Sequence, residues 1–299
     1  MSLYQISRLA NEATAPLVPL AALDTLFIQL SGTLCNLACR HCFVPSGPKE
    51  DRAPMMAREQ LVKYLDQAEA LGVRDYYVTG GEPMLHPDFE ALCAEILRRG
   101  PLTVLSNGTL VDEARAARLA TLAEQTPYSF DLRISLDGVS ADENDPIRGG
   151  GSFDAVITGI RRLAAVGFDP IVTVVEHRPE VGSQASRASF LAFLRDLGLP
   201  RPRCKFLPLL RVGREPRRTH DYTTEDLAVL HGPIEPDVAA RLACSTTRLV
   251  SALGVHICPL LLDGEGALLG QSLADSLGPQ RLRWSACRTC LVEGLQCRT

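Results

Sequence analysis

Three cysteines lie close together near the start of the chain. The stretch CNLACRHC places thiols at Cys35, Cys39 and Cys42, with His41 directly before the third. A structural zinc ion takes four closed ligands, and we expect His41 to point away from a site that its neighbour Cys42 faces. In a [4Fe–4S] cluster each thiolate holds its own iron, so three ligands leave one iron open. The spacing therefore favours an iron–sulfur cluster with a free position over zinc or unliganded core cysteines.

A second group of cysteines lies near the end of the chain. Cys244, Cys258, Cys287 and Cys290 form a set of four, and the last two make a C-x2-C pair. Such a set suits a fully ligated iron–sulfur cluster or a structural zinc ion, and the motif alone does not decide between them. Cys297 follows, and three roles stay open for it: a further ligand, the remnant of a second cluster site, or a free thiol.

Composition indicates a soluble, cytoplasmic protein. The chain has 299 residues, 46% of them hydrophobic, and a net charge of −4, which gives no electrostatic reason to expect nucleic acid or a membrane as partner. The N-terminal stretch is interrupted by Pro16 and Pro19, so we predict neither a signal peptide nor a membrane span. Ten cysteines are many for a reducing compartment, where clustered thiols indicate metal binding or catalysis rather than disulfides. Cys93 and Cys204 stand alone and are predicted to pack in the core. For Cys204 the alternative is a further ligand of the auxiliary site.

Strand and helix patterns alternate six times, which predicts an α/β fold with a parallel sheet. The expected strands are 25–32, 74–80, 102–106, 128–136, 170–176 and 204–210. The expected helices are 61–71, 88–100, 112–125, 152–167 with Ser152 as N-cap, and 183–198. Six units are too few for a closed eight-stranded barrel, so we predict a partial (β/α)6 barrel over 25–210. Residues 1–24 would form an N-terminal segment, and 211–299 a small cysteine-rich extension.

Polar and glycine-rich motifs follow four of these strands. The cysteine motif follows the first, TGGEP (79–83) the second, SNGT (106–109) the third, and SLDG (135–138) ends the fourth. Singly, each motif reads as an ordinary loop. Because the carboxyl ends of barrel strands form one rim, the set predicts a site there.

Over residues 25–210 these motifs resemble the radical S-adenosylmethionine (SAM) enzymes. The resemblance implies that the three N-terminal cysteines hold a [4Fe–4S] cluster whose open iron is chelated by SAM. His41 takes a position, often aromatic in the family, near the adenine. Gly80, Gly81 and Glu82 match the segment that receives the methionine amino group, where glycines allow close backbone approach and a carboxylate could accept from an ammonium.

Other candidates for SAM contact follow from the same resemblance. Ser135 and Arg148, the latter in DPIRGG, would contact the ribose or the carboxylate of SAM, and an arginine can bind a carboxylate through two parallel bonds. The alternative for Arg148 is a solvated loop side chain. Asn107 and Asp137 are further candidates, although either could serve only in turn hydrogen bonds.

The extension, over about residues 240–290, resembles the SPASM and twitch extensions that carry auxiliary [4Fe–4S] clusters. The resemblance implies a Cys–hairpin–Cys pair, a short helix and the C-x2-C pair, with all four cysteines on one cluster.

Together the resemblances imply an oxidative enzyme, with no catalytic side chain assigned. Reduced flavodoxin or ferredoxin would supply an electron, and cleavage of SAM would give a 5′-deoxyadenosyl radical that takes hydrogen from a peptide side chain or a small metabolite. The auxiliary cluster would then accept the electron left on the substrate. Only about 24 residues precede the first strand, too few for a peptide-binding winged-helix domain. The alternative is a non-catalytic iron–sulfur or zinc carrier, against which the ordered GGEP, SLDG and IRGG motifs argue.

Overall fold

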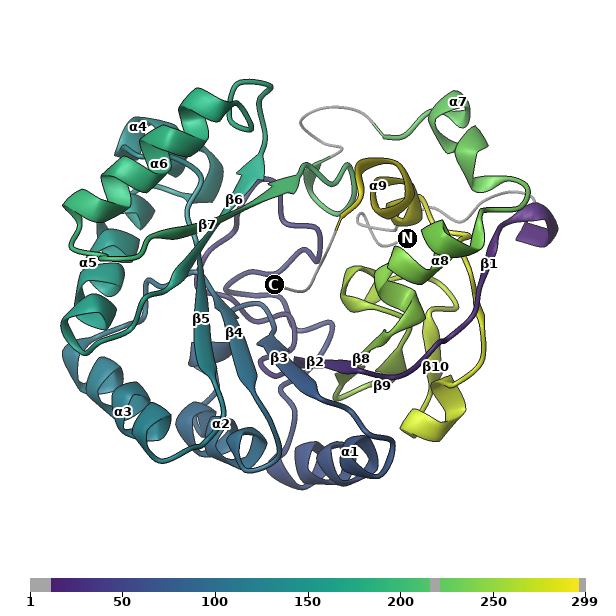
Figure 1. Cartoon of the computed structure of the whole chain (residues 1–299), viewed down its shortest axis with the longest axis horizontal. Coiled ribbons are helices and arrows are strands. Elements are labelled where there is room, and N and C mark those ends of the chain that lie inside the picture. The colour runs from purple at the N-terminus through teal and green to yellow at the C-terminus, as the bar shows by residue number, and fades with distance from the viewer. Residues whose placement is uncertain (1–11, 216–220, 296–299) are drawn as a thin grey trace.

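A single curved sheet of nine strands organises the protein, in the order β10-β9-β8-β2-β3-β4-β5-β6-β7 (Figure 1). The computed structural model describes residues 12–215 and 221–295, so Cys297 lies outside the described residues. No helix in these two ranges is long and apolar enough to cross a membrane.

Six parallel strands form the partial barrel, in chain order. They are β2 (Thr25–Gln29), β3 (Asp75–Thr79), β4 (Leu102–Ser106), β5 (Phe130–Ser135), β6 (Ile171–Glu176) and β7 (Arg203–Pro208). Each overlaps an expected strand, so the predicted fold class is confirmed.

Helices cover the outer face of this sheet (Figure 1). Five were expected, namely α1 (Arg58–Ala70), α2 (Phe89–Leu97), α3 (Glu113–Glu124), α5 (Ser152–Ala165) and α6 (Gln184–Asp196). In β5, Leu132 and Ile134 belong to the buried core shared with the helices, whereas Arg133 between them lies on the opposite face of the sheet. The helices thus bury one face of each strand, and the strand ends are left to form the rim.

One further helix, α4 (Ala141–Arg148), was not expected because its sequence is mostly polar and contains Pro146. The prediction of Ser152 as the N-cap of the next helix, α5, was wrong by one residue. Gly151 takes the N-cap position, and Ser152 is the first helical residue. The Ser152 hydroxyl donates to Asp145 Oδ1 at 3.0 Å, which ties α5 to α4.

The extension joins the same sheet. β8 (Thr247–Ser251) runs parallel to β2. β9 (Gly254–His256) pairs antiparallel with β8, and β10 (Leu268–Gly270) pairs antiparallel with β9. β1 (Leu17–Val18) pairs with β11 (Gln280–Arg281), so the N-terminal segment packs on the extension. The helices of the extension are α7 (Thr224–Leu227), α8 (Pro236–Arg241), α9 (Ala286–Glu293) and the short turns η4 (Ala228–Leu230), η5 (Ala243–Ser245), η6 (Pro259–Leu261) and η7 (Leu273–Ser276), and the N-terminal segment has the short turn η1 (Glu12–Thr14).

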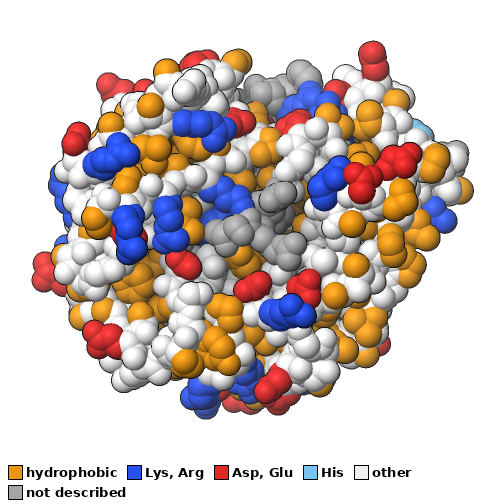
Figure 2. Space-filling model, in the orientation of Figure 1, with side chains coloured by type: hydrophobic (Ala, Val, Ile, Leu, Met, Phe, Trp, Pro, Cys, Tyr) orange, Lys and Arg blue, Asp and Glu red, His pale blue; other side chains and the backbone are white. Residues whose placement is uncertain are grey.

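Charges of both signs are mixed over the face shown in Figure 2, where Lys and Arg side chains lie over α6 and β7 among acidic and hydrophobic ones. The face therefore carries no field of a single sign, in keeping with the small net charge.

Candidate functional site

The three N-terminal cysteines lie in the loop that leaves the carboxyl end of β2. This loop is anchored by a bridge between Leu34 and Gly47, and Cys35 N donates to Gly47 O at 3.1 Å. Cys42 N donates to Cys39 O at 3.3 Å. Burial raises the pKa of all three thiols, that of Cys35 to about 12. Binding a metal cluster here therefore means displacing protons from buried thiols, as thiolate ligation requires.

Gly80 and Gly81 press directly against this loop. A Cβ on Gly80 would lie 2.1 Å from Ser31 Oγ, and one on Gly81 would lie 2.1 Å from Leu34 O and 2.9 Å from Cys35 Cβ. The sequence prediction explained the two glycines by the approach of a ligand. In the structure the space beside their Cα atoms is filled by the loop after β2, so the glycines are needed to pack it.

The Glu82 carboxylate is turned into the protein. It accepts from Met84 N at 3.1 Å, Ser106 Oγ at 2.8 Å and Asn107 N at 2.7 Å. Burial raises its pKa, and these hydrogen bonds oppose that shift. Glu82 thus joins the ends of β3 and β4. Its predicted role as an acceptor for a ligand ammonium stays a prediction.

Asn107 links the end of β4 to the cysteine loop. Its Nδ2 donates to Asn36 Oδ1 at 2.9 Å and lies 3.8 Å from Cys35 Sγ. Its Oδ1 accepts from Thr109 N at 2.9 Å, which is the turn hydrogen bond considered as the alternative. Asn107 therefore makes that turn and also contacts a predicted cluster ligand.

A buried charged cluster of His41, Asp137 and Arg148 lies beside the cysteine loop. His41 Nε2 is 2.6 Å from Asp137 Oδ2, and Arg148 Nε is 2.8 Å from the same oxygen. Burial alone would raise the pKa of Asp137, but the charges of Arg148 and His41 outweigh it and hold that pKa well below its usual range. Arg148 Nη1 also lies 4.0 Å from Cys39 Sγ. The Arg148 guanidinium thus places a positive charge next to Cys39, a predicted ligand of an anionic iron–sulfur cluster.

Arg148 is consequently not a solvated loop residue. It ends α4 with 7% of its surface exposed. Ser135 is half-buried at the end of β5, where it pairs in register with Thr173. The structure thus brings all of the predicted rim residues to the carboxyl ends of β2 to β5, while contact with SAM stays a prediction for each.

Three contributors to this rim were missed, namely Gly213, Arg214 and His177. Gly213 has φ +69°, and a Cβ there would lie 2.4 Å from Cys42 O, while Arg214 N donates to Cys42 O at 3.0 Å and Arg214 Nη1 to Cys39 O at 3.3 Å. His177 follows β6, with Nδ1 3.0 Å from Val175 O, and burial lowers its pKa. His177 could have been found by its place after a strand, like the other motifs. Arg214 offered no such local signal.

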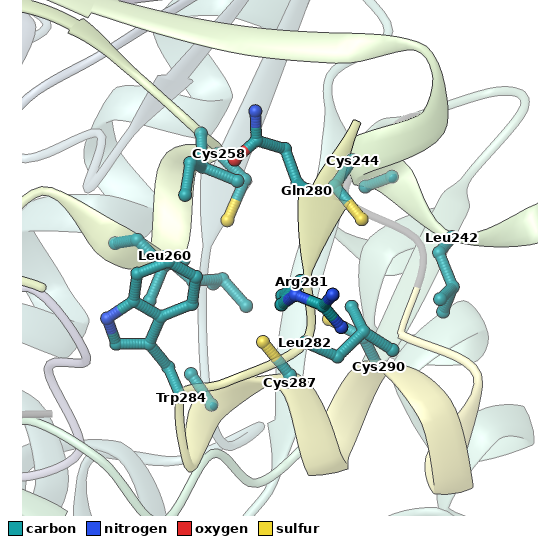
Figure 3. Close-up of a pocket in the computed structure, with 14 residues that line it drawn as sticks. Leu242, Cys244, Cys258, Leu260, Gln280, Arg281, Leu282, Trp284, Cys287 and Cys290 are labelled. Atoms are coloured by element: carbon teal, nitrogen blue, oxygen red, sulfur yellow. The ribbon is translucent and has the colours of Figure 1, made fainter. Parts of the chain in front are cut away.

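The four later cysteines line one pocket of about 30 Å³ (Figure 3). Cys244 lies on η5, Cys258 follows β9, and Cys287 and Cys290 lie on α9. The β8–β9 hairpin lies between the first two, as predicted. The short helix η7 follows, also as predicted, and the C-x2-C pair itself lies on α9. In residues 12–215 and 221–295 no three His, Cys, Asp or Glu side chains are arranged to share a single metal ion.

The other walls of this pocket are largely apolar. They include Ile257, Leu260, Leu261 and Trp284, all nearly inaccessible to solvent. Burial raises the pKa of Cys287 to about 12. Four thiols in an apolar enclosure are the donor set that a buried, fully ligated iron–sulfur cluster requires.

The two isolated cysteines pack as expected. Cys93 is fully buried in the core on α2, and Cys204, at the start of β7, is partly buried against the same core. Burial raises the pKa of both thiols, that of Cys204 to about 11.

Comparison with known proteins identifies the barrel. A profile of the radical SAM superfamily matches residues 30–177. Mycofactocin maturase MftC of Mycobacterium ulcerans (strain Agy99) is 37% identical over 150 residues, 50% of this chain and 39% of that protein. GTP 3′,8-cyclase of Peptoclostridium acidaminophilum is 31% identical over 151 residues, 48% of this chain and 44% of that protein. The chain spans about two-fifths of the length of these curated relatives.

The structural likeness reaches further along the chain. SuiB of Streptococcus suis, solved with S-adenosylmethionine and also with precursor peptide SuiA, has a TM-score of 0.61. Its identity is 19%, and the match with the S-adenosylmethionine complex covers 82% of this chain and 61% of that one. At this identity the likeness shows the fold alone, over more of the chain than the family profile matches.

Proposed function

Because the chain belongs to the radical SAM superfamily through residues 30–177, we propose that it is an oxidative maturase that uses two iron–sulfur clusters to modify a peptide side chain. The superfamily uses SAM and a [4Fe–4S] cluster. When bound, these would supply a 5′-deoxyadenosyl radical. The observation that carries the proposal is the meeting of Cys35, Cys39 and Cys42 with the GGEP and Asp137–Arg148 elements at one rim.

The chain's own residues would hold and orient these groups. The three cysteines of the β2 loop would ligate the first cluster, and Arg148 beside Cys39 would offset its negative charge. Gly81 would keep Cys35 at its position, because any larger residue meets the loop backbone. His41, Ser135 and the backbone of Gly80 stay our candidates for SAM contact.

We propose that the four cysteines of the extension bind an auxiliary [4Fe–4S] cluster. Full ligation by Cys244, Cys258, Cys287 and Cys290 would leave no iron open to substrate, which favours electron transfer over substrate binding. The auxiliary cluster would accept the electron left on the substrate, and reduced flavodoxin or ferredoxin would supply the first electron. The competing occupant is structural zinc.

The peptide substrate is supported by two kinds of likeness. The protein that matches half of this chain at 37% identity, MftC, is a maturase, and SuiB, which shares the fold, has been solved with a precursor peptide. The small-metabolite alternative is supported by the match to GTP 3′,8-cyclase over a similar stretch. A short precursor reading frame beside the gene would supply a test peptide, and mass spectrometry would detect the loss of hydrogen from it.

The deciding experiment is anaerobic iron and sulfide analysis with EPR. We expect about eight irons in the wild type and about four in either the Cys35/Cys39/Cys42→Ala or the Cys287/Cys290→Ala variant, since each cluster holds four irons. About four irons with zinc in the wild type would instead make the extension a zinc site and remove the electron acceptor. Formation of 5′-deoxyadenosine from SAM and reductant separates an enzyme from a carrier, which would form none.

A further inference from the structure

A fully buried arginine lies beside the four-cysteine pocket. Arg248, on β8, has no solvent-exposed surface. Its Nε donates to Ser276 O at 2.9 Å, and its Nη1 to Cys244 O and Thr247 O, each at 2.8 Å. Its Nη2 donates to Gly278 O at 3.2 Å. Every guanidinium nitrogen therefore has a hydrogen-bond acceptor, and all of these acceptors are neutral backbone carbonyls.

The guanidinium of Arg248 is thus fully hydrogen-bonded, but within residues 12–215 and 221–295 no carboxylate pairs with it. Burial lowers the pKa of Arg248, and of the described residues it is Cys244, whose carbonyl accepts from Arg248 Nη1, and Cys258 that would oppose this shift when ionised. A buried charge without an opposite charge costs several kcal/mol. The anionic partner that the fold offers Arg248 is therefore the sulfur of Cys244 or Cys258 when these thiols ligate a cluster.

We propose that Arg248 is the counter-charge of the auxiliary cluster and sets its reduction potential. This inference rests on the proposed auxiliary cluster. A cluster ligated by four thiolates is anionic, and reduction adds further negative charge. A fixed buried cation at Cys244 stabilises the reduced form more than the oxidised form, which raises the potential, since net charge is among the determinants of cluster potential. Arg248 would thereby make this cluster a better electron acceptor.

The test is an EPR-monitored redox titration of the anaerobic holoprotein. The Cys35/Cys39/Cys42→Ala variant serves to assign the auxiliary signal. In Arg248→Gln we expect the equilibrium constant for reduction of the auxiliary cluster to fall about tenfold, a shift of about 59 mV to more negative potential. Arg248→Lys keeps the charge and should stay close to the wild type. The SAM-binding cluster of the same molecule should keep its potential in both variants.

A matched control removes a charge near the same cysteine. Arg241 lies three residues before Cys244 but is exposed and paired with Asp237 at 2.8 Å. Arg241→Gln should leave the auxiliary potential unchanged, because solvent and Asp237 already screen that charge.

A second pair of variants tests the same charge without removing Arg248. Gly278 is exposed, a Cβ there meets nothing within 4 Å, and its carbonyl accepts from Arg248. Gly278→Asp should therefore fold, and it should shift the potential in the same negative direction by a smaller amount, whereas Gly278→Asn should not. These variants decide the question if Arg248→Gln does not fold.

The outcomes separate this inference from the proposed function. An auxiliary cluster whose potential is unchanged in Arg248→Gln and Gly278→Asp overturns the role of Arg248 and leaves the enzyme proposal intact. A wild-type extension that binds zinc instead of iron overturns both. A negative shift confined to the auxiliary cluster supports the counter-charge role, which a merely structural arginine would not produce.

Discussion

Replacing Asp137 by asparagine should show how much the buried cluster of His41, Asp137 and Arg148 contributes to the free energy of unfolding. The Asp137 side chain has no solvent exposure, and those of His41 and Arg148 are only 7% and 8% exposed. Asparagine preserves the shape and removes the charge, which leaves the Arg148 guanidinium buried without its carboxylate. Removing one partner of a buried ion pair costs about 3–5 kcal/mol. We expect Asp137→Asn to lower the free energy of unfolding by about that amount at neutral pH.

The assay is anaerobic urea unfolding of a double-mutant cycle. The single variants Asp137→Asn and Arg148→Met and the double variant are compared with the wild type, all with the cluster-binding cysteines intact. Because the double variant removes both charges, its destabilisation should be smaller than the sum of the two single changes by about 1–3 kcal/mol. Asp112→Asn is the control, since this exposed aspartate caps α3 through Arg115 N and asparagine caps equally well.

The reasoning is refuted by additive single variants, or by an Asp137→Asn variant that loses less than about 1 kcal/mol. Either result would mean that water or rearranged dipoles already compensate Arg148. In that case the proximity of Arg148 to Cys39 would have no electrostatic consequence for the first cluster.

Three further predictions concern single sites. Gly81→Ala should lower iron bound by the β2 loop at least several-fold without affecting the auxiliary cluster, as measured by EPR, because its Cβ would overlap Leu34 O; full iron content would contradict the packing argument. Cys93→Ala should cost about 1–2 kcal/mol in urea unfolding with unchanged iron content, as expected for a core residue, and a loss of iron would instead make Cys93 a ligand. Hydrogen bonds from Arg98 and Arg58 lower the pKa of Glu95 to about 2, so Glu95→Gln should be less stable by about 1 kcal/mol at pH 7, a figure reduced for the exposure of both arginines. This difference should vanish as the pH falls from about 4.5 to about 2, because the depressed pKa stabilises only the ionised carboxylate; a difference that persists at pH 2 would exclude the ion pairs as its cause.

The barrel was largely predictable because its signals are local. The strands β2 to β7 are short apolar runs, and the helices between them repeat apolar residues at helical spacing. The helix α4 was not predictable, because Pro146 and a polar composition are typical of a loop. The helix is stabilised by tertiary packing of its buried residues, which a local pattern does not show. The pairing of β8 with β2 joins residues more than two hundred positions apart, and no local pattern encodes it.

For the site, the sequence predicted which residues gather at one rim but not which contacts each side chain makes there. The motifs meet because parallel strands end at one rim. The direction of each side chain depends on contacts across the fold. Glu82 turns inward to Ser106 and Asn107, and Asp137 pairs with Arg148 rather than serving only in a turn. Arg214 contacts Cys39 across 175 positions, a distance that a sequence motif does not span.

Residues 210–214 connect the two cysteine sites. Leu210 and Val212 belong to the apolar cluster against which Cys244, Cys258, Cys287 and Cys290 pack. The next two residues, Gly213 and Arg214, hold the carbonyls of Cys42 and Cys39. The boundary expected at residue 210 therefore precedes a segment that contacts both sites. Because close-packed contacts hold this segment on both sides, the extension helps to position the β2 loop and is a structural part of the predicted SAM-binding rim.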